Sequence, residues 1–305
     1  MIKSVTITNY HGESIVIELP EGNPDHGLII NKIEGLGPPT ASINTTNLAT
    51  NDGSIYNSAR IQERNIIFGL IFSFCPRIED ARQNTYRYFP IKKNVEILIE
   101  TDNRIVKTNG FVESNEPDVF SKDESTQISI ICTDPYFYSA GENGLNTTYF
   151  YGIEPRFEFA FDNDSLTEDL IEMSSIETIH EKTVVYEGDA EVGVVITIHI
   201  LGEVGNITLY SVLSRESMTI DVGKIQEITG QELQVSDDII ISTVRGDKSI
   251  KLLRAGVYTN ILNCLEKDSD WFRLTKGDNI FAYVADYGGE NIEIKIENRI
   301  LYEGV

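Results

Sequence analysis

The stretch from Ile33 to Phe74 constrains this chain more than any other part of its sequence. It opens with glycines and prolines at positions 35–39, passes through a polar segment and reaches Asp52-Gly53, a pair that favours a turn. From Ile55 to Phe74 the sequence predicts one continuous extended strand. At about 3.3 Å per residue that strand would span about 60 Å, whereas most strands have about 5 or 6 residues. A monomeric domain rarely contains such a strand, so we expect an arm that pairs with a neighbouring subunit.

The length and composition are typical of a two-domain globular protein. The chain has 305 residues, of which 41% are hydrophobic and 24% are charged, and a chain of this length usually forms two domains. The segment 139–148 is small, polar and rich in glycine, so it is the best candidate for a linker. We therefore expect an N-terminal domain over residues 1–138 and a C-terminal domain over residues 149–305.

No part of the sequence predicts a membrane span, because no window approaches about 18 uncharged apolar residues. The first residues, MIKSVTITNYHGES, lack the apolar core and the cleavage site of a signal peptide. Cys75, Cys132 and Cys264 are widely spaced and form no CxxC pair, which is typical of buried thiols in a reducing compartment. We therefore expect a protein that folds in the cytosol.

Residues 1–138 are predicted to form an α+β domain dominated by strands. Apolar residues at helical spacing predict one helix from Ile78 to Phe89, which Pro90 ends. Strands are expected at Ile2–Thr8, Ile15–Leu19, Leu28–Glu34, Val95–Glu100, Arg104–Glu113 and Glu124–Thr133.

The remainder of the chain is predicted to be all-β. Glycine-containing turn signals separate short apolar runs, a spacing typical of a β-sandwich or jelly roll. The expected strands are Arg156–Phe161, Val184–Glu187, Val192–Ile200, Ile207–Ser211, Ser217–Val222, Asp238–Thr243, Ser249–Leu253, Ile280–Ala285 and Asn291–Ile300. The whole chain is therefore predicted to be mainly β.

The chain is strongly acidic. It carries 25 basic and 48 acidic residues, a formal net charge of −23 at pH 7. The imbalance is larger in the second half, since 12 basic and 18 acidic residues precede Tyr138 and 13 basic and 30 acidic residues follow it. Nucleic-acid binding needs a basic surface, and an anionic membrane would repel this chain. We expect neither sequence-specific nucleic acid nor membrane as a partner, and solubility alone can explain the acidic surface.

No motif predicts catalysis, a metal or a cofactor. The four histidines form no HExxH or HxH pattern, which a zinc site would need, and GxSxG, GxxxxGK[ST] and GxGxxG are all missing from the sequence. Acidic pairs such as Asp162 with Asp164 and Asp237 with Asp238 could supply two carboxylates for glycoside hydrolysis. Chance produces many such pairs among 48 acidic residues, so we expect no catalytic residue, no metal site and no cofactor site.

A set of motifs nevertheless runs through most of the chain. They are IEGL at 33–36, NDG at 51–53, the arginine-bearing strand 60–67, YRYFP at 86–90, GFVE at 110–113, CTDPYF at 132–137, SDW at 269–271 and RILYEG at 299–304. In these motifs the chain resembles the phage distal tail protein family, the tail-tip hub subunits of long-tailed phages of Gram-positive bacteria. The C-terminal part is similar to the second domain of that family, a galectin-like sandwich. None of the motifs is a catalytic signature.

The resemblance implies a structural subunit of a tail tip. Distal tail proteins form a hexameric ring that joins the tail tube to the tail-tip hub and anchors receptor-binding or baseplate proteins. The expected partners are further copies of the chain, the tail tube protein, the tail-tip hub or tail-associated lysin protein and the tape measure protein. The expected location is the tail tip or baseplate of a virion or a tail-like bacteriocin, assembled in the bacterial cytoplasm.

In such a ring the strand from Ile55 to Phe74 would contact the neighbouring subunit, because a closed ring leaves no edge strand unpaired. Arg60 and Arg64 would form ion pairs or hydrogen bonds there, and solvated positions on a polar face are the alternative. DNA would pass through the lumen without specific contacts, and an acidic lumen would repel its phosphates. The expected interface residues are Arg60, Gln62, Arg64, Ile66 and Phe68.

Two other classes of protein stay open. One is a carbohydrate-binding protein whose C-terminal sandwich holds a host cell-surface glycan, with Trp271 and tyrosines as a stacking platform. The other is a glycosidase that acts on cell wall through a pair of carboxylates. Both alternatives predict a working monomer, whereas a hub subunit has to assemble.

Overall fold

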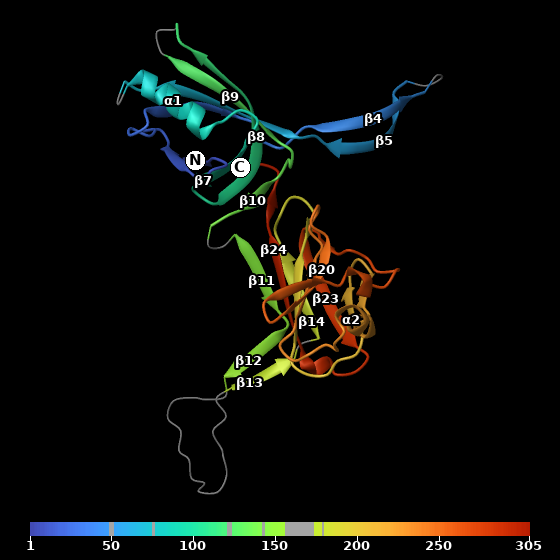
Figure 1. Cartoon of the computed structure of the whole chain (residues 1–305). Helices are drawn as coiled ribbons and strands as arrows, with labels where there is room; N and C mark the ends of the chain where they lie inside the picture. The colour runs from blue at the N-terminus through green and yellow to red at the C-terminus, as the bar shows by residue number, and fades with distance from the viewer. Residues whose placement is uncertain (49–51, 75–76, 121–123, 142–143, 156–173, 179) are drawn as a thin grey trace, which may run out of the picture. The chain divides into compact units, whose positions relative to one another are not determined.

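The structure is a computed structural model that describes the whole chain except residues 49–51, 75–76, 121–123, 142–143, 156–173 and 179. The described residues form two compact units (Figure 1). The first unit contains Met1–Gly144 together with Leu301–Val305, and the second contains Leu145–Ile300. The last five residues of the sequence, which the expected boundary assigned to the C-terminal domain, thus belong to the first unit. Antiparallel strands dominate both units, which confirms the mainly-β fold class.

The first unit is built on a nine-stranded antiparallel sheet. Seven of its strands follow the order β2-β1-β7-β8-β9-β6-β3, and β10 pairs with both β8 and β25. Because β25 lies in the last five residues of the sequence, those residues complete the sheet. The strands are β1 (Ile2–Thr8), β2 (Ser14–Glu18), β3 (Leu28–Glu34), β6 (Arg64–Phe72), β7 (Asn94–Thr101), β8 (Ile105–Asp118), β9 (Ser125–Cys132), β10 (Phe137–Ser139) and β25 (Leu301–Tyr302).

One helix, α1 (Ile78–Tyr88), lies against this sheet and contacts β6 and β8. The helix buries Ala81, Thr85 and Tyr88. Phe89, the residue after it, is buried with its ring 6.2 Å from that of Phe68 on β6. Alternate residues of the strands supply the rest of the core, since successive side chains of a strand point to opposite faces. The helix begins where its apolar spacing predicted.

Strands β4 (Ala41–Asn47) and β5 (Ser54–Ile61) form a separate two-stranded antiparallel sheet. This pair follows β3 and precedes β6 in the chain and runs away from the nine-stranded sheet as an arm (Figure 1). We call β4 and β5 together the arm.

The prediction of one continuous strand from Ile55 to Phe74 was wrong. β5 ends at Ile61 and β6 begins at Arg64. β6 is paired on both sides, with β3 and β9, and buries alternate residues, whereas every residue of β5 is exposed. The ladder between β6 and β9 begins at Arg64, so the chain changes partner there. The second strand of the arm is β4, which lies in the polar segment where the sequence analysis predicted no strand.

The second unit contains a six-stranded sheet, in the order β11-β24-β16-β19-β20-β21, and a four-stranded sheet, in the order β14-β23-β17-β18. Two shorter pairs, β12 with β13 and β15 with β22, accompany them. The strands are β11 (Leu145–Tyr149), β12 (Tyr151–Pro155), β13 (Ser174–Thr178), β14 (Glu181–Tyr186), β15 (Val192–Gly193), β16 (Val195–Ile200), β17 (Ile207–Ser211), β18 (Glu216–Ile220), β19 (Asp238–Ser242), β20 (Ser249–Arg254), β21 (Val257–Asn260), β22 (Arg273–Leu274), β23 (Gly277–Ala285) and β24 (Ile292–Arg299).

The second unit also contains a helix that the sequence analysis missed, α2 (Val222–Thr229). The Asp221 side chain caps it by accepting a hydrogen bond from the backbone N–H of Lys224, and Gly230 ends it in the left-handed conformation. The predicted strand at Arg156–Phe161 lies outside the described residues. Within the described part of the chain, no helix is long and apolar enough to cross a membrane.

Candidate assembly surface

The arm has one apolar and one polar face. Directly opposed residues of an antiparallel pair share a face, and the register pairs Ala41 with Ile61, Ile43 with Ala59, and Thr45 with Tyr56. Their side chains therefore form one largely apolar surface along both strands. We call this surface, made of Ala41, Ile43, Thr45, Tyr56, Ala59 and Ile61, the apolar arm face.

The opposite face of the arm is mainly polar. Ser42 is paired with Arg60 there, and Asn44 with Ser58. The Asn44 side-chain amide donates a 3.1 Å hydrogen bond to the Ser58 hydroxyl. The register shifts after Asn44, and Ile55, paired with Thr46, lies on this face and is its one large apolar residue. This arrangement separates the two arginines that the sequence suggested for one interface, because only Arg60 lies on the arm.

The apolar arm face is open to solvent. The exposed fraction of Ile43 is 62% and that of Tyr56 is 63%. A two-stranded hairpin by itself is only marginally stable in water, and both of its edges offer unpaired backbone groups. The arm thus has the properties of a segment that is completed by another surface.

The arm is nearly free of charge in a strongly acidic chain. β4 has 7 residues and β5 has 8, and Arg60 is the one charged residue among them, whereas 24% of the whole chain is charged and its net charge is −23. Charged residues are depleted at the centre of protein interfaces because they are costly to remove from water. The composition of the arm therefore resembles that of the centre of a protein interface.

The five predicted interface residues lie in three different places. Arg60 lies on the polar face of the arm. Gln62 lies at the base of the arm, where its backbone N–H donates a 2.9 Å hydrogen bond to the carbonyl of Thr40. Arg64, Ile66 and Phe68 lie on β6 with their side chains buried inside the first unit. These three side chains are therefore occupied within their own chain, since β6 is a central strand rather than part of the arm.

Arg64 connects the base of the arm to the sheet and is only 3% exposed. Its guanidinium donates to four backbone carbonyls, those of Gly35, Gly37, Pro135 and Glu303. The distances are 2.6 Å to Gly37, 2.7 Å to Pro135 and 2.6 Å to Glu303. Burial lowers the pKa of this guanidinium from its ordinary value, as expected for a cation removed from water.

The sequence analysis missed the apolar arm face itself. A signal for it was present, because Ile43 is a large apolar residue in the polar run before the Asp52-Gly53 turn and Tyr56 is an aromatic residue soon after that turn. The partners of Arg64 had no local signal, since the Glu303 carbonyl is 239 positions away in the sequence.

A second feature is a cavity of about 320 Å³ in the second unit. Its wall includes Glu203, Gln226 and Glu232 with the aromatic ring of Tyr287. Asn206, also in the wall, donates a 3.0 Å hydrogen bond to the carboxylate of Asp286 and accepts one from a backbone N–H of α2. Polar groups and an exposed aromatic ring at one cavity are typical of sites for small polar ligands.

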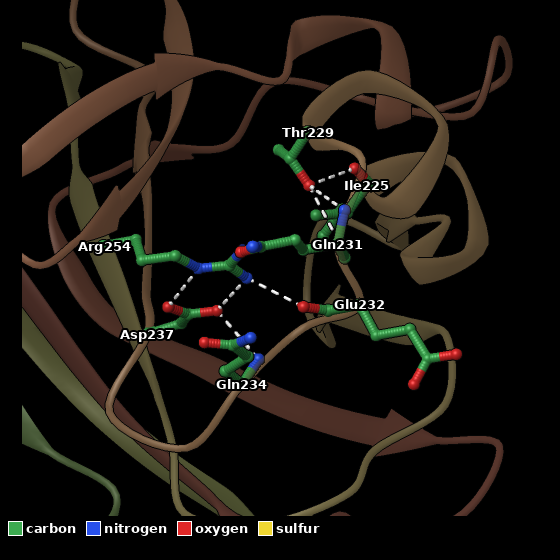
Figure 2. A network of polar contacts seen from close by, with 7 residues as sticks. All are labelled: Ile225, Thr229, Gln231, Glu232, Gln234, Asp237 and Arg254. Atoms are coloured by element: carbon green, nitrogen blue, oxygen red, sulfur yellow. Dashed lines mark hydrogen bonds and ion pairs between the residues drawn. The ribbon is translucent and has the colours of Figure 1, made fainter.

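Glu232, which follows α2 and lines the cavity, belongs to a polar network around Arg254 and the buried Asp237 (Figure 2). Asp237 accepts a 2.9 Å hydrogen bond from Nε of Arg254 and a 2.8 Å bond from the backbone N–H of Gln234. Arg254 also donates to the side chain of Gln231 and the carbonyl of Glu232. The hydrogen bonds that Arg254 donates to Asp237 raise the pKa of Arg254, so the segment is fixed by a cation that stays charged.

The described residues hold no group of three or more histidine, cysteine or acidic side chains that could bind a metal ion. Asp237 binds Arg254, and the carboxylate of Asp238 lies at hydrogen-bond distance, 2.6 Å, from Nδ1 of His199. The acidic pair Asp237 and Asp238 is thus engaged in two separate contacts. The pair Asp162 and Asp164 lies outside the described residues. Trp271 does not line the cavity in the second unit. Nζ of Lys248 lies 5.1 Å from the centroid of the Trp271 ring.

No protein-family model matches the sequence, and no curated protein matches it either. The structure is similar to that of the Dit protein of phage SPP1, described as a paradigm of the hub adsorption apparatus in phages that infect Gram-positive bacteria. The similarity covers 98% of this chain and 99% of that one, with a TM-score of 0.67 and 11% identity.

Two baseplate structures of phage P2 in its activated conformation, with Ca and with Sr, also match over nearly the whole chain. Their identities are 13% and 12%, and their TM-scores of 0.48 and 0.46 are too low to carry an argument. At 11% identity the similarity to the SPP1 protein shows the fold, and it does so over both units. The chain therefore has the fold of the phage distal tail proteins, the family that its sequence motifs resemble.

Proposed function

We propose that the protein is the structural hub subunit of a phage-type tail tip and that six copies of it close into a ring. The observation that carries this proposal is the arm, whose apolar face has no cover in the described chain. In the ring, the apolar arm face of each copy lies on the first unit of its neighbour. The arm then replaces the single long strand that the sequence suggested as the contact.

The charge of the arm favours a second copy as its occupant. Copies of a chain with a net charge of −23 repel one another. A contact between them needs a segment without acidic residues, and β4 and β5 carry one arginine and no carboxylate. A heterologous contact of this kind generates a ring if its rotation closes.

The ring joins the tail tube protein to the tail-tip hub or tail-associated lysin protein, and it anchors receptor-binding or baseplate proteins. It surrounds the passage for the tape measure protein and for DNA, without sequence-specific contacts. The subunit performs no catalysis, and the second unit is a galectin-like sandwich that serves as an attachment module. The particle is a virion or a tail-like bacteriocin that is assembled in the bacterial cytoplasm.

The two faces of the arm provide a matched test. Ile43→Ser removes an exposed isoleucine from the apolar arm face, and Ile55→Ser removes one of similar exposure, 51%, from the polar face. Burying such a side chain contributes about 1.5–3 kcal/mol, and about 1.4 kcal/mol changes an affinity tenfold. Light scattering and negative-stain images should show rings for wild type and Ile55→Ser and smaller species for Ile43→Ser.

Equal assembly of the two variants would contradict the proposed contact. Rings that are absent from all three proteins, even when a tail tube protein is added, would contradict the hub function itself. Melting temperatures of the three proteins serve as the control for folding.

The cavity in the second unit favours a second candidate function, the binding of a host cell-surface glycan. Tyr287, 56% exposed at the cavity, would stack on a sugar ring while the neighbouring amide and carboxylate side chains accept hydrogen bonds from the sugar hydroxyls. Tyr287→Ala should then abolish binding of the full chain on a glycan array. Tyr258→Ala, on β21 and away from the cavity, removes a tyrosine of 62% exposure and serves as the control.

A further inference from the structure

The arm is attached to the first unit by two short segments, residues 35–40 on one side and residues 62–63 on the other. These two connections run in opposite directions, and a hydrogen bond from Gln62 to Thr40 joins them, so together they form the hinge between the arm and the sheet. The Gly35 residue, with φ of 84°, and Gly37 add local freedom on one side. A ring contact needs the arm in one direction, so something has to fix this hinge.

Arg64 is placed to do so. It is the first residue of β6 and is therefore held by the central part of the sheet. Its Nη1 donates to the carbonyls of both Gly35 and Gly37, the first segment of the hinge. Its Nε donates to Pro135, and its guanidinium carbon lies 4.3 Å from the ring centroid of the buried Phe137. The side chain thus joins the arm base to the body through a rigid, planar group.

The same guanidinium also holds the segment Leu301–Val305. Nη2 of Arg64 donates to the carbonyl of Glu303 at 2.6 Å. Next to it, the backbone N–H of Val305 donates a 3.0 Å hydrogen bond to the carbonyl of Leu36, in the first segment of the hinge. A Cβ atom on Gly304 would lie 3.1 Å from that same carbonyl oxygen. The segment is therefore packed directly onto the base of the arm.

We propose that Arg64 is the positioning residue of the arm: it locks the arm base and the segment Leu301–Val305 to the sheet as one junction, and so sets the direction in which the arm meets its neighbour. Neither contact lies on the apolar arm face, so Arg64 acts on assembly from inside its own chain. The use of the arm direction in a ring rests on the proposed function, whereas the junction itself can be tested in a single chain.

The test measures the distance between the arm and the sheet by pulsed electron–electron double resonance between two spin labels. Spin labels are placed on Ser58→Cys, on the polar face of the arm, and on Asn109→Cys, an exposed position of β8. Cys75→Ser is added to the background, while Cys132 and Cys264 are buried. The protein is diluted until light scattering gives the mass of one chain, so the result does not depend on ring formation.

Arg64→Lys is the main variant. Lysine keeps the charge, but its three donors share one nitrogen and cannot reach four carbonyls as the guanidinium fork does. We expect a narrow distance distribution for the wild type, a broadened and shifted one for Arg64→Lys, and loss of rings at high concentration. Arg82→Lys, a replacement on α1 away from the junction, is the matched control and should leave the distribution narrow.

Gly304→Val tests the junction from its other side and keeps Arg64 intact. Its side chain would push the segment away from Leu36, so it should broaden the distribution even if Arg64→Lys fails to fold. Distributions as narrow as that of the wild type in the folded variants would overturn the proposal. If the wild-type chain gives a narrow distance distribution but forms no ring, the junction is supported and the hub function is contradicted.

Discussion

Strands β5 and β6 are separated by two residues and are similarly rich in isoleucine, yet they lie in opposite environments. β6 is central in the nine-stranded sheet and buries Ile66, Phe68 and Leu70. β5 is exposed along its whole length and pairs with β4. The difference arises because β6 is paired on both sides within its own chain, whereas β5 is paired only with β4 and the apolar arm face has no cover in the described chain.

This comparison separates two uses of apolar residues. In β6 they stabilise the fold of one chain, and in the arm they are available to a second one. Sparse charge is common to both, since a residue that is to be buried in an interface has the same requirements as one in a core. The comparison can therefore be tested by measuring whether changes in each strand affect the stability of the single chain or its assembly.

Stability should respond most strongly to β6. Phe68→Ala removes a fully buried ring, and Phe→Ala changes in cores cost about 3–5 kcal/mol of unfolding free energy. Tyr56→Ala removes an exposed ring from the arm, and surface changes of that kind usually stay within about 0.5 kcal/mol. Urea denaturation of the two variants at a concentration that gives single chains measures the difference. Equal losses would mean that the arm belongs to the core.

Assembly should respond most strongly to the arm. Replacing Ala41–Ile61 by a short Gly/Ser linker removes both strands and leaves every strand of the nine-stranded sheet in place. We expect an unchanged denaturation midpoint for the rest of the chain together with complete loss of rings. Light scattering of the same samples distinguishes rings from single chains. A ring formed by the shortened protein would show that the contacts between subunits lie outside the arm.

Two glycines with similar backbone conformation allow a finer comparison. Gly35, in the junction, and Gly53, at the tip of the arm, have φ of 84° and 93°. A Cβ on Gly35 would lie 2.0 Å from the carbonyl oxygen of Asn65, whereas one on Gly53 would have no neighbour within 4 Å. Gly35→Ala should therefore lower the unfolding free energy by clearly more than the roughly 1 kcal/mol that left-handed strain alone costs. Similar melting temperatures for the two variants would show that the backbone of the junction can shift to accommodate a Cβ atom at position 35.

Acid should weaken the body of the first unit by a small amount and leave the arm strands untouched. Hydrogen bonds from Arg87 and Asn9 lower the pKa of the Glu13 carboxyl from 4.5 to about 2. Because the pKa is lower in the folded state, this pair stabilises the fold above pH 4.5, and the contribution is lost as the pH falls from 4.5 to about 2. Glu13→Gln should flatten this part of the acid titration of stability, and Glu21→Gln is the exposed control. If the unfolding free energy of both variants and the wild type falls equally as the pH drops below 4.5, Glu13 is not the group responsible.

Much of this fold could be predicted because its strands follow simple periodic patterns. The bounds Ile2–Thr8 and Ile207–Ser211 agree with the structure at both ends, and α1 begins at the predicted residue. The helix α2 was missed although Asp221 and Gly230 mark its ends, because the short apolar run before it continued into Val222 as a strand pattern.

The assembly surface could be predicted only in part, because it depends on contacts far apart in the sequence. The sequence analysis expected an arm that begins at Ile55, but it based this on a continuous strand to Phe74, and only the part up to Ile61 lies on the arm. The division between β5 and β6 follows from the pairing of β6 with β9, about which the local sequence carries no information. For the same reason Arg64 resembles Arg60 in the sequence, although one is buried in the junction and the other lies on the arm.

The most direct test of this account is the mass of the wild-type protein in solution. Light scattering should give about six times the single-chain mass of 34.2 kDa, with six-fold rings in negative-stain images of the same sample. A stable single chain at high concentration, unchanged by a tail tube protein, would contradict the central claim that the exposed arm is completed by a second copy.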